Sequence, residues 1–414
     1  MTKNNSKIIN LGCRLNFFES EVIKNILDEK NIDQKIVINT CAVTNQAVRK
    51  SINEVKKASK NFPKHKILVT GCASQIEKKK FSELTNVSRI IDNSKKTEFE
   101  SYIGRSSKTN KTYNFPYFAN FISSRSRATL QIQQGCDHRC TFCIIPYGRG
   151  DSKSLPFEQI FKRTENILNQ GYSEITFTGV DLTSYGSDLP GKPKLGNIIK
   201  RLLFLQPKLK RLRLSSIDPA EIDPDLLNLL CNENRLLPHL HLSLQSGDNL
   251  ILKRMKRRHN REQVISLCDK LKSARPEFTF GADVIVGFPT EKDQNFLETL
   301  NLIKKCNFSN VHIFPYSSKE GTPASRMPQV SERIKKERVK ILREESSKML
   351  YNQLNNVIGK STCILFESNK KSYTDEFFKV KIPKEINATL KSGSFVNVTI
   401  ISRKDDMLIA EILK

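Results

Sequence analysis

The feature that most constrains this chain is a group of three cysteines in one short loop. Cys136, Cys140 and Cys143 follow an apolar run, residues 128–134, with the spacing Cys-x3-Cys-x2-Cys. A loop of this length can direct three thiolates at one inorganic centre, but it supplies no fourth. A structural zinc site takes four protein ligands, and an ordinary four-iron cluster likewise takes four cysteines. Three ligands leave one iron open, as a centre that binds its substrate directly requires.

With the aromatic Phe142 before its last cysteine, this loop resembles the cluster motif of radical S-adenosylmethionine enzymes. The resemblance implies a 4Fe–4S cluster on Cys136, Cys140 and Cys143, whose open iron chelates the amino and carboxylate groups of S-adenosylmethionine. An electron from the cluster then cleaves that cofactor to a 5′-deoxyadenosyl radical, so the three cysteines are the predicted catalytic residues. The alternative is a set of three buried structural cysteines or a degenerate zinc loop.

Length and composition indicate a globular protein of two or three domains, since 414 residues exceed one ordinary core. Residues 1–11 hold only a short apolar stretch, which is no signal peptide, and no later run reaches the roughly 20 apolar residues of a membrane span. We therefore expect a cytoplasmic protein. Its ten cysteines then indicate metal ligation or catalysis rather than disulfides, because that compartment keeps thiols reduced. Four isolated cysteines are interpreted as packing residues: Cys231, Cys268, Cys306 and Cys363.

The charge of the chain predicts a polyanionic partner. Sixty-nine Lys and Arg residues against 43 Asp and Glu give a formal net charge of +26. An excess of this size bears on partners rather than on fold, and a nucleic acid is the natural candidate. The alternative is a lysine-rich surface that is merely solvated.

Near the N-terminus, short apolar runs of strand length alternate with helix-like stretches. Such an alternation is typical of a parallel α/β sheet. Strands are predicted at 7–10, 35–39 and 65–70, and helices at 17–29 and 46–59. A cysteine follows each predicted strand closely: Cys13, Cys41 and Cys72. Because the carboxyl ends of parallel strands share one edge, we expect these thiols to converge there. The spacing alone leaves open three unrelated buried cysteines.

The sequences around these cysteines resemble the N-terminal domain of the methylthiotransferases. The similar segments are Gly12-Cys13-Arg14-Leu15-Asn16 with Glu19-Ser20-Glu21, Asn39-Thr40-Cys41-Ala42-Val43-Thr44, and Gly71-Cys72-Ala73. The resemblance implies that Cys13, Cys41 and Cys72 hold a second, auxiliary 4Fe–4S cluster. The open iron of that cluster carries or donates the sulfur that these enzymes insert.

The middle of the chain predicts a polar linker and then a barrel. Residues 92–127 are interpreted as the linker, with an aromatic part at 113–121. Six strand candidates then alternate with helices, which fits a partial (β/α)6 barrel with its active site at the carboxyl ends of the strands. The strands are predicted at 128–134, 174–178, 211–215, 239–244, 278–286 and 310–314, and helices at 156–169, 263–274, 293–305 and 331–353.

The last fifty residues predict a small β-barrel. Strands are expected at 362–367, 377–382, 395–401 and 407–412, with a turn at 392–394. The pattern resembles the TRAM domain, an RNA-binding barrel that ends many tRNA methylthiotransferases, although residues 370–376 replace its usual Gly-rich stretch. We thus divide the α/β chain into an N-terminal open parallel α/β domain (1–92), a linker (93–127), a radical S-adenosylmethionine partial barrel with a trailing helix (128–358) and a TRAM-like β-barrel (359–414).

Cofactor contacts are expected where barrel strands end. The segment 178–181 resembles the one that lies along the methionine amino group, and 285–289 resembles the motif that packs on the adenine. Each segment alone would be an ordinary strand-to-loop turn, and their order along one barrel supports the assignment. Phe142 or Tyr147 is a candidate to stack on a substrate base, with a core role as the alternative. The predicted cofactor-binding residues are Thr178, Gly179, Asp181, Ser215, Ser216, Gln245, Arg257, Val286 and Gly287.

The resemblance also implies a substrate and partners. Residues 12–16 and 39–44 resemble the branch that inserts sulfur and a methyl group at C2 of N6-threonylcarbamoyladenosine, next to the tRNA anticodon. This reaction uses two iron–sulfur clusters and S-adenosylmethionine, and an electron-donor protein such as a flavodoxin or ferredoxin. No membrane partner is expected. The alternatives are isopentenyladenosine in tRNA or a ribosomal protein aspartate as substrate, or a non-catalytic zinc-bearing RNA-binding protein.

Overall fold

The computed structural model describes residues 6–104, 114–116, 126–368, 371–383 and 390–413. The chain forms two compact units. The first unit consists of residues 1–120, 131–155 and 317–326, and the second of 121–130, 156–316 and 327–414. Most of the aromatic part of the predicted linker lies outside the described residues. Within the described ranges, no helix is both long and apolar enough to cross a membrane.

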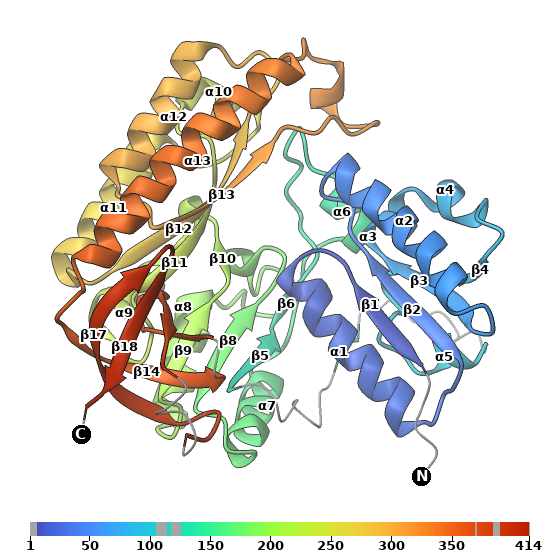
Figure 1. The fold of residues 1–414 in the computed structure, drawn as a ribbon, viewed down its shortest axis with the longest axis horizontal. Coiled ribbons are helices and arrows are strands. Elements are labelled where there is room, and N and C mark those ends of the chain that lie inside the picture. The colour runs from blue at the N-terminus through green and yellow to red at the C-terminus, as the bar shows by residue number, and fades with distance from the viewer. Residues whose placement is uncertain (1–5, 105–113, 117–125, 369–370, 384–389, 414) are drawn as a thin grey trace. The chain divides into compact units, whose positions relative to one another are not determined.

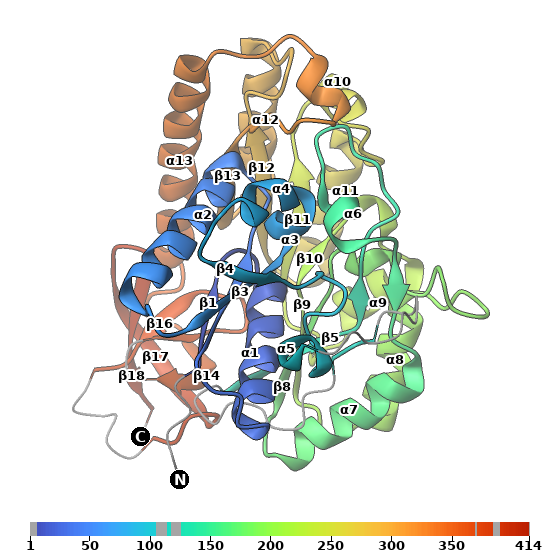
Figure 2. The same cartoon turned by 90° about the vertical axis from the view of Figure 1, so that its right-hand side faces the viewer.

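A four-stranded parallel sheet is the framework of the first unit (Figures 1 and 2). Its strands, in order, are β1 (Lys7–Asn10), β2 (Lys35–Thr40), β3 (Lys66–Gly71) and β4 (Val87–Ile90), and its first helices are α1 (Arg14–Glu29), α2 (Asn45–Asn61), α3 (Cys72–Ile76), α4 (Lys78–Ser82) and α5 (Glu100–Ile103). Ile36 and Ile38 of β2 pack with α2, whereas Val37 packs with α1. Both faces of the sheet are therefore covered, which explains why its strands are apolar throughout. The three strands expected from the sequence are present, and β4 is an addition to them.

The predicted strand at 128–134 is interrupted at Ile132. Its first part, β5 (Arg127–Gln131), joins a sheet with strands of the second unit, while β6 (Gln133–Gln134) pairs with β7 (Lys153–Ser154). The interruption has a polar cause, because the buried Gln133 amide donates to the Gly135 carbonyl at 2.8 Å and to the Ser152 hydroxyl at 3.0 Å. The cysteine loop follows β6 and ends at α6 (Ile145–Arg149).

Parallel strands also form the centre of the second unit, in two adjacent sheets. The strands are β8 (Glu174–Thr178), β9 (Arg211–Leu214), β10 (Ser216–Ile217), β11 (His239–Gln245), β12 (Thr279–Val286) and β13 (Asn310–Pro315). One sheet has the order β5-β8-β9 and the other β10-β11-β12-β13. The division falls at Ser215: Leu212 pairs with Leu236 but Ser216 pairs with His241, so the pairing shifts by one residue. The expected barrel strands are thus all present, with one irregularity in their hydrogen bonding.

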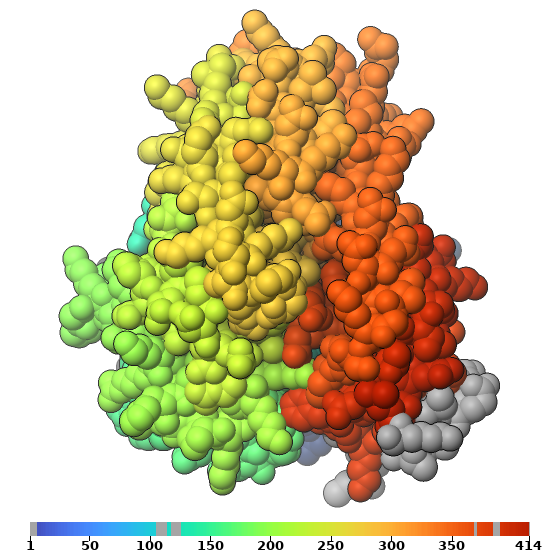
Figure 3. Space-filling model, turned by 90° about the vertical axis from the view of Figure 1, so that its left-hand side faces the viewer, coloured from blue at the N-terminus to red at the C-terminus, as the bar shows by residue number. Residues whose placement is uncertain are grey.

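Helices connect these strands and pack on one side of them (Figure 1). They are α7 (Phe157–Asn169), α8 (Leu195–Leu205), α9 (Pro224–Asn232), α10 (Asn249–Arg254), α11 (Arg261–Ala274), α12 (Asp293–Lys305) and α13 (Glu332–Asn355), with 3₁₀ turns at Leu182–Ser184 and Pro219–Glu221, and one at Pro323–Arg326 in the first unit. Figure 3 shows the helical side, where α11, α12 and α13 lie next to one another. Two cysteines interpreted as isolated, Cys268 and Cys306, are buried and hydrogen-bond each other.

The C-terminal region is a closed five-stranded barrel, as the sequence predicted. Its strands, in barrel order, are β14 (Ser361–Ser368), β15 (Lys371–Tyr373), β16 (Lys379–Lys381), β18 (Met407–Ile412) and β17 (Phe395–Lys404). The expected strand at 377–382 is shorter than predicted, because Phe377 has φ +71° and its N–H donates to the Thr374 carbonyl in a turn. The strand β15 is an addition to the prediction, and it lies in the stretch that departs from the TRAM pattern.

Residues 374–377 of this barrel contact the amino ends of the parallel strands in the same unit. The Arg213 guanidinium in β9 donates to the carbonyls of residues 374 and 375, at 2.8 and 2.9 Å. The Thr279 hydroxyl at the start of β12 donates to the carbonyl of residue 376 at 2.6 Å. The Phe377 ring stacks on His239 at the start of β11, with 5.0 Å between ring centroids. The C-terminal barrel is therefore packed against the parallel strands rather than joined to them only by a tether.

Candidate active site

Three thiols of the first unit converge at the carboxyl edge of its sheet. Cys41 follows β2, Cys72 begins α3 after β3, and Cys13 caps α1, where its sulfur accepts the Asn16 N–H at 3.5 Å. A Cβ placed on Gly12 would lie only 3.0 Å from the Cys41 sulfur, so the first two loops are in contact. Burial raises the pKa of the Cys41 thiol to about 11, and the neighbouring Cys13 and Cys72 thiolates raise it as well. The three cysteines are therefore near neighbours at this edge of the sheet.

Two buried cations lie close to these thiols. Arg149 and Lys96 both pair with the fully buried Glu19, at 2.9 and 2.5 Å. Arg149 also donates to the Asn16 amide oxygen at 2.6 Å. Burial disfavours the charged forms of both side chains, whereas Glu19 and the Cys72 thiolate favour them. The pKa of Arg149 is raised well above its ordinary value, and the pKa of Lys96 is lowered. Because one carboxylate faces two cations, this buried group has a net positive charge.

A third cation, Lys319, comes from the late segment 317–326 of the same unit. Its side chain is 5% exposed, and the nearest carboxylate oxygen, from Glu77, is 3.7 Å from the ammonium nitrogen. Within the described part of the chain that nitrogen has no hydrogen-bond partner. Burial lowers the pKa of Lys319, against the charges of Glu77 and Cys41. A buried ammonium that has only this long ion pair and lies near the Cys41 thiol fits an anionic group bound at these sulfurs, and thiolates are the ligands of iron–sulfur clusters.

Sequence reasoning singled out the cysteines but not the charged residues around them. Glu19 lies within a segment singled out for its resemblance, yet a carboxylate on a helix gives no signal of burial. Arg149, Lys96 and Lys319 are three of 69 basic residues. Only the fold distinguishes them from solvated lysines and arginines.

The second group of cysteines lies on the loop between β6 and α6. Main-chain hydrogen bonds shape this loop: the Cys136 N–H donates to the Gly150 carbonyl and the Cys143 N–H to the Cys140 carbonyl, both at 3.1 Å. The Ile145 N–H donates to the Cys143 sulfur at 3.4 Å. All three cysteines are half-buried, so their sulfurs remain accessible to an inorganic centre.

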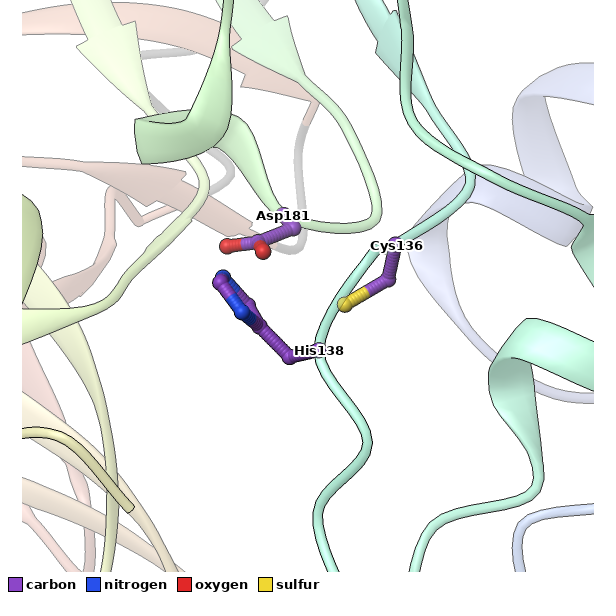
Figure 4. A group of neighbouring side chains, drawn as sticks. All are labelled: Cys136, His138 and Asp181. Atoms are coloured by element: carbon purple, nitrogen blue, oxygen red, sulfur yellow. The ribbon is translucent and has the colours of Figure 1, made fainter. Parts of the chain in front are cut away.

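Figure 4 shows Cys136 and His138 on this loop, and Asp181 on the loop after β8. The Cys136 sulfur and a ring nitrogen of His138 lie within 4.8 Å of each other. In the second unit, Asp181 accepts a hydrogen bond from the Ser184 hydroxyl at 2.8 Å. Sequence reasoning gave His138 no role, because a single histidine between candidate ligand cysteines carries no signal of its own.

Eight of the nine predicted cofactor-binding residues lie where strands of the second unit end. Thr178 ends β8 and is followed by Gly179 and Asp181, and Ser215 and Ser216 lie at the junction of β9 and β10. Gln245 is the last residue of β11, and Val286 is the last residue of β12, with Gly287 directly after it. The Ser215 hydroxyl is buried and has no hydrogen-bond partner among the described residues. Such a hydroxyl fits a polar ligand, because an unpaired buried hydroxyl is otherwise costly.

Arg257 differs from the other eight, because it lies beyond α10 and binds protein groups. Its guanidinium donates to the Asp218 carboxylate at 3.0 Å and to the Ser243 carbonyl at 2.8 Å. These bonds hold the side chain against β11. A contact between Arg257 and the cofactor stays a prediction.

Comparison with known proteins identifies the family. Residues 130–303 match the model of the radical SAM superfamily, and residues 5–92 match an uncharacterized protein family, UPF0004. A Rickettsia prowazekii protein named threonylcarbamoyladenosine tRNA methylthiotransferase MtaB is 46% identical over 388 residues, which cover 91% of each chain. This chain belongs to the radical SAM methylthiotransferase family. A Bacillus subtilis protein of the same name is 35% identical over an alignment of 356 residues, which covers 80% of this methylthiotransferase and 77% of the relative.

A solved structure supports the fold assignment. The radical S-adenosylmethionine methyltransferase TsrM from Kitasatospora setae superposes with a TM-score of 0.57, at 11% identity, over 78% of this chain and 77% of its own. At this identity the likeness concerns the fold alone. As a radical SAM methylthiotransferase, the protein is an enzyme that transfers sulfur-containing groups, and its family implies S-adenosylmethionine and a 4Fe–4S cluster as cofactors.

Proposed function

We propose that this enzyme inserts sulfur and a methyl group at C2 of N6-threonylcarbamoyladenosine in tRNA, next to the anticodon, with the help of two 4Fe–4S clusters. The observation that supports the second cluster is the buried positive charge near Cys13, Cys41 and Cys72, above all the Lys319 ammonium, which has no hydrogen-bond partner among the described residues and only a 3.7 Å ion pair with Glu77. The substrate is supported by the names of the relatives and by the net charge of +26.

In this proposal each cysteine loop binds one cluster through three thiolates. Cys136, Cys140 and Cys143 would leave one iron open to S-adenosylmethionine, and Cys13, Cys41 and Cys72 would hold the auxiliary cluster. When bound, the first cluster and S-adenosylmethionine supply a carbon radical. The hydrogen at C2 of the base requires such a radical, because general acid–base catalysis accelerates a reaction by about a hundred- to ten-thousand-fold and does not remove an aromatic hydrogen.

The protein would tune these centres with its own dipoles and charges. The Asn93 amide donates to the Cys72 sulfur at 3.8 Å, and the Ile145 N–H donates to the Cys143 sulfur. Hydrogen bonds to ligand sulfur and nearby positive charge favour the reduced, more negative state of a cluster. The Ser215 hydroxyl would donate to the ribose or the carboxylate of the cofactor.

The positive charge of the protein would attract the tRNA, and the tRNA would offer an accessible base. Lysine and arginine side chains neutralise phosphates and release counterions, which gives affinity without sequence preference. An adenosine in the anticodon loop is largely single-stranded, so that exposing it costs at most a few kcal/mol. The TRAM-like C-terminal barrel is proposed as part of the RNA-binding surface.

Nucleoside mass analysis of tRNA tests the proposal. Cells that lack the gene should lose 2-methylthio-N6-threonylcarbamoyladenosine and accumulate its unthiolated precursor. The wild-type gene and the Cys231→Ser variant should restore the product, whereas Cys41→Ser and Cys140→Ser should not. The purified Cys41→Ser protein should retain about half of the wild-type iron, because one of two clusters is lost.

Three other outcomes would contradict the proposal. A lost isopentenyl derivative would move the substrate to isopentenyladenosine. An unchanged tRNA profile with iron and sulfide present in the protein would indicate a protein substrate such as a ribosomal aspartate. A colourless protein that contains zinc without iron would indicate a non-catalytic RNA-binding protein.

A further inference from the structure

One face of the sheet β10–β13 is polar along β11, where a packed parallel sheet would be apolar, whereas Ile285 and Phe314 lie on the same face of β12 and β13 and are half-buried. Along β11 the residues Leu240, Leu242 and Leu244 are fully buried, and the alternate positions hold only polar side chains that are half-exposed. Parallel strands that are packed on both faces are apolar throughout, and the inside of a closed parallel barrel is filled with branched apolar side chains. The alternation in β11 therefore indicates that one face of this sheet is open to a polar ligand.

Three side chains on this face form a hydrogen-bonded group across three neighbouring strands. His241 of β11 and His312 of β13 both contact the same carboxylate oxygen of Asp283 in β12, at 3.0 and 3.2 Å. The two imidazole rings lie 4.7 Å apart between centroids. Gly281 makes room for this arrangement, because a Cβ there would lie 2.6 Å from Nδ1 of His241. We call His241, Asp283 and His312 the polar triad.

Within the polar triad, His312 is the member that faces solvent. Its side chain is 52% exposed, against 17% for His241 and 29% for Asp283. The bond from Nδ1 to Asp283 fixes the orientation of the ring and leaves Nε2 for a ligand. A neutral His312 accepts a hydrogen bond from a hydroxyl at Nε2, and a protonated His312 donates one to a carboxylate.

A metal ion is the competing occupant of such a group. Two histidines and one carboxylate are a common ligand set for divalent metals. In the polar triad the two ring nitrogens and the carboxylate oxygen that would bind the metal are bonded to each other, so that a metal would have to replace both hydrogen bonds. Of the two ring nitrogens outside these bonds, Nδ1 of His241 and Nε2 of His312, the second is on the more exposed ring and is the one offered to a polar organic group.

We infer that the polar triad recognises the N6 substituent of the substrate base, with Nε2 of His312 bound to the hydroxyl or carboxylate of its threonyl end. This inference rests on the proposed function and names the side chains that would make the enzyme specific for its substrate base. A half-exposed polar face penalises an apolar isopentenyl group, because binding that group buries the triad without replacing its hydrogen bonds to water. The triad thus selects the threonylcarbamoyl substituent.

Binding of three matched RNAs tests this inference without turnover. The RNAs are one anticodon stem-loop sequence that carries adenosine, N6-threonylcarbamoyladenosine or N6-isopentenyladenosine at the position after the anticodon. Affinities are measured by fluorescence anisotropy with cluster-loaded full-length protein. The wild type should prefer the threonylcarbamoyl RNA about tenfold over the adenosine RNA, the size of one strong hydrogen bond, and should bind the isopentenyl RNA no better than the adenosine RNA.

The variants localise the preference. The His312→Leu substitution should bring the affinities for threonylcarbamoyl and adenosine RNA to within about twofold of each other. The His312→Gln substitution should keep part of the preference for threonylcarbamoyl RNA, because its amide can still hydrogen-bond. The Asp283→Asn substitution should reduce the same preference. His65→Leu makes the same substitution in the first unit and should leave the preference intact. Because His312 is exposed, the His312→Gln variant is expected to fold, which circular dichroism checks.

Failure of the inference and failure of the proposed function give different results. If the wild type methylthiolates the threonylcarbamoyl RNA but His312→Leu keeps the full preference, the inference is wrong and the proposed function stands. If the wild type does not modify that RNA, the proposed function itself fails. One equivalent of a divalent metal that is lost in His312→Leu and Asp283→Asn, but not in His65→Leu, would identify the polar triad as a metal site and overturn the inference.

Discussion

At the scale of single residues, the most consequential side chain outside the cysteines is Glu19. It is fully buried and balances one of two buried cations, Arg149 and Lys96. Removing one partner of a buried ion pair leaves an uncompensated charge, which costs far more than the net value of the pair. Glu19 therefore holds together the group of charges beside Cys13 and Cys72.

We predict that Glu19→Gln lowers the free energy of unfolding by about 3 kcal/mol, because it leaves two buried cations without a counter-charge. Urea denaturation measures the change. Glu158→Gln is the matched control, since Glu158 and Lys162 form an exposed pair at 2.6 Å, and it should leave the midpoint unchanged. Equal effects of the two substitutions would contradict the assigned role of Glu19.

The same carboxylate gives the stability a pH dependence of known sign. Burial raises the pKa of Glu19, but Arg149 and Lys96 lower it more, and the result lies below the ordinary value of 4.5. A carboxyl group with a depressed folded-state pKa contributes stability above its unfolded pKa and loses it as the pH falls through the folded value. The difference between wild type and Glu19→Gln should thus be full at neutral pH and shrink below about pH 4.

The sequence indicates the candidate ligands more clearly than their surroundings. Cysteine spacing is a local signal, so the loop from Cys136 to Cys143 and the thiols after three strands can be identified without the fold. The burial of Lys319 and Arg149 is not local, because it depends on which distant segments fold into the same unit. The polar triad gives no sequence signal for the same reason: its three residues are adjacent only through strand pairing.

At the scale of elements, the C-terminal barrel is joined to the parallel strands by a buried charge cluster. Glu174 at the start of β8 is 1% exposed and accepts from the Arg213 guanidinium at 2.7 Å, while Arg211 pairs with Asp375 of the C-terminal barrel at 3.0 Å. Arg127 links Glu174 to Glu367 of β14, at 3.8 and 2.5 Å. The cluster thus lies at the amino ends of the strands, where residues contribute to stability rather than to catalysis.

We predict that Glu174→Gln loosens the C-terminal barrel and lowers the free energy of unfolding by about 3 kcal/mol, since it leaves buried arginines without their shared carboxylate. Limited proteolysis should cleave the variant faster than the wild type near residue 358. The control Glu411→Gln replaces an exposed residue of β18 and should leave the cleavage rate unchanged. Wild-type resistance of Glu174→Gln would show that the charge cluster does not fasten the barrel.

The elements themselves are largely predictable from the sequence, and the exceptions have a physical cause. The predicted bounds of Glu174–Thr178 and Asp293–Lys305 agree with the structure because alternating or helical apolar patterns fix them. The run at 128–134 favours one strand, since nothing local shows that Gln133 turns to bond Ser152. The strand β15 escapes prediction because three residues are too few for a periodic signal.

At the scale of the whole molecule, the excess of positive charge bears on how the enzyme finds its substrate. A formal net charge of +26 attracts a polyanion over a distance set by the ionic strength. Binding that depends on phosphate contacts weakens with salt, because counterions must be displaced again.

We predict that affinity for an anticodon stem-loop falls at least about tenfold between about 50 and about 200 mM salt, as three or more phosphate contacts require. The salt slope should be the same for RNAs with adenosine and with N6-threonylcarbamoyladenosine, because the substituent does not change the phosphate contacts. Titration at four salt concentrations measures both slopes. An affinity that is independent of salt would exclude the proposed electrostatic attraction to RNA.

The position of Lys319 in the chain has a consequence for the order of events during synthesis. The cysteines at 13, 41 and 72 leave the ribosome early, whereas Arg149 follows later and the segment 317–326 emerges only after most of the second unit has been made. Until then the three thiols lack one of the cations that surround them in the finished protein. Loading of the proposed auxiliary cluster at these thiols is therefore expected to follow translation of the chain rather than to accompany it.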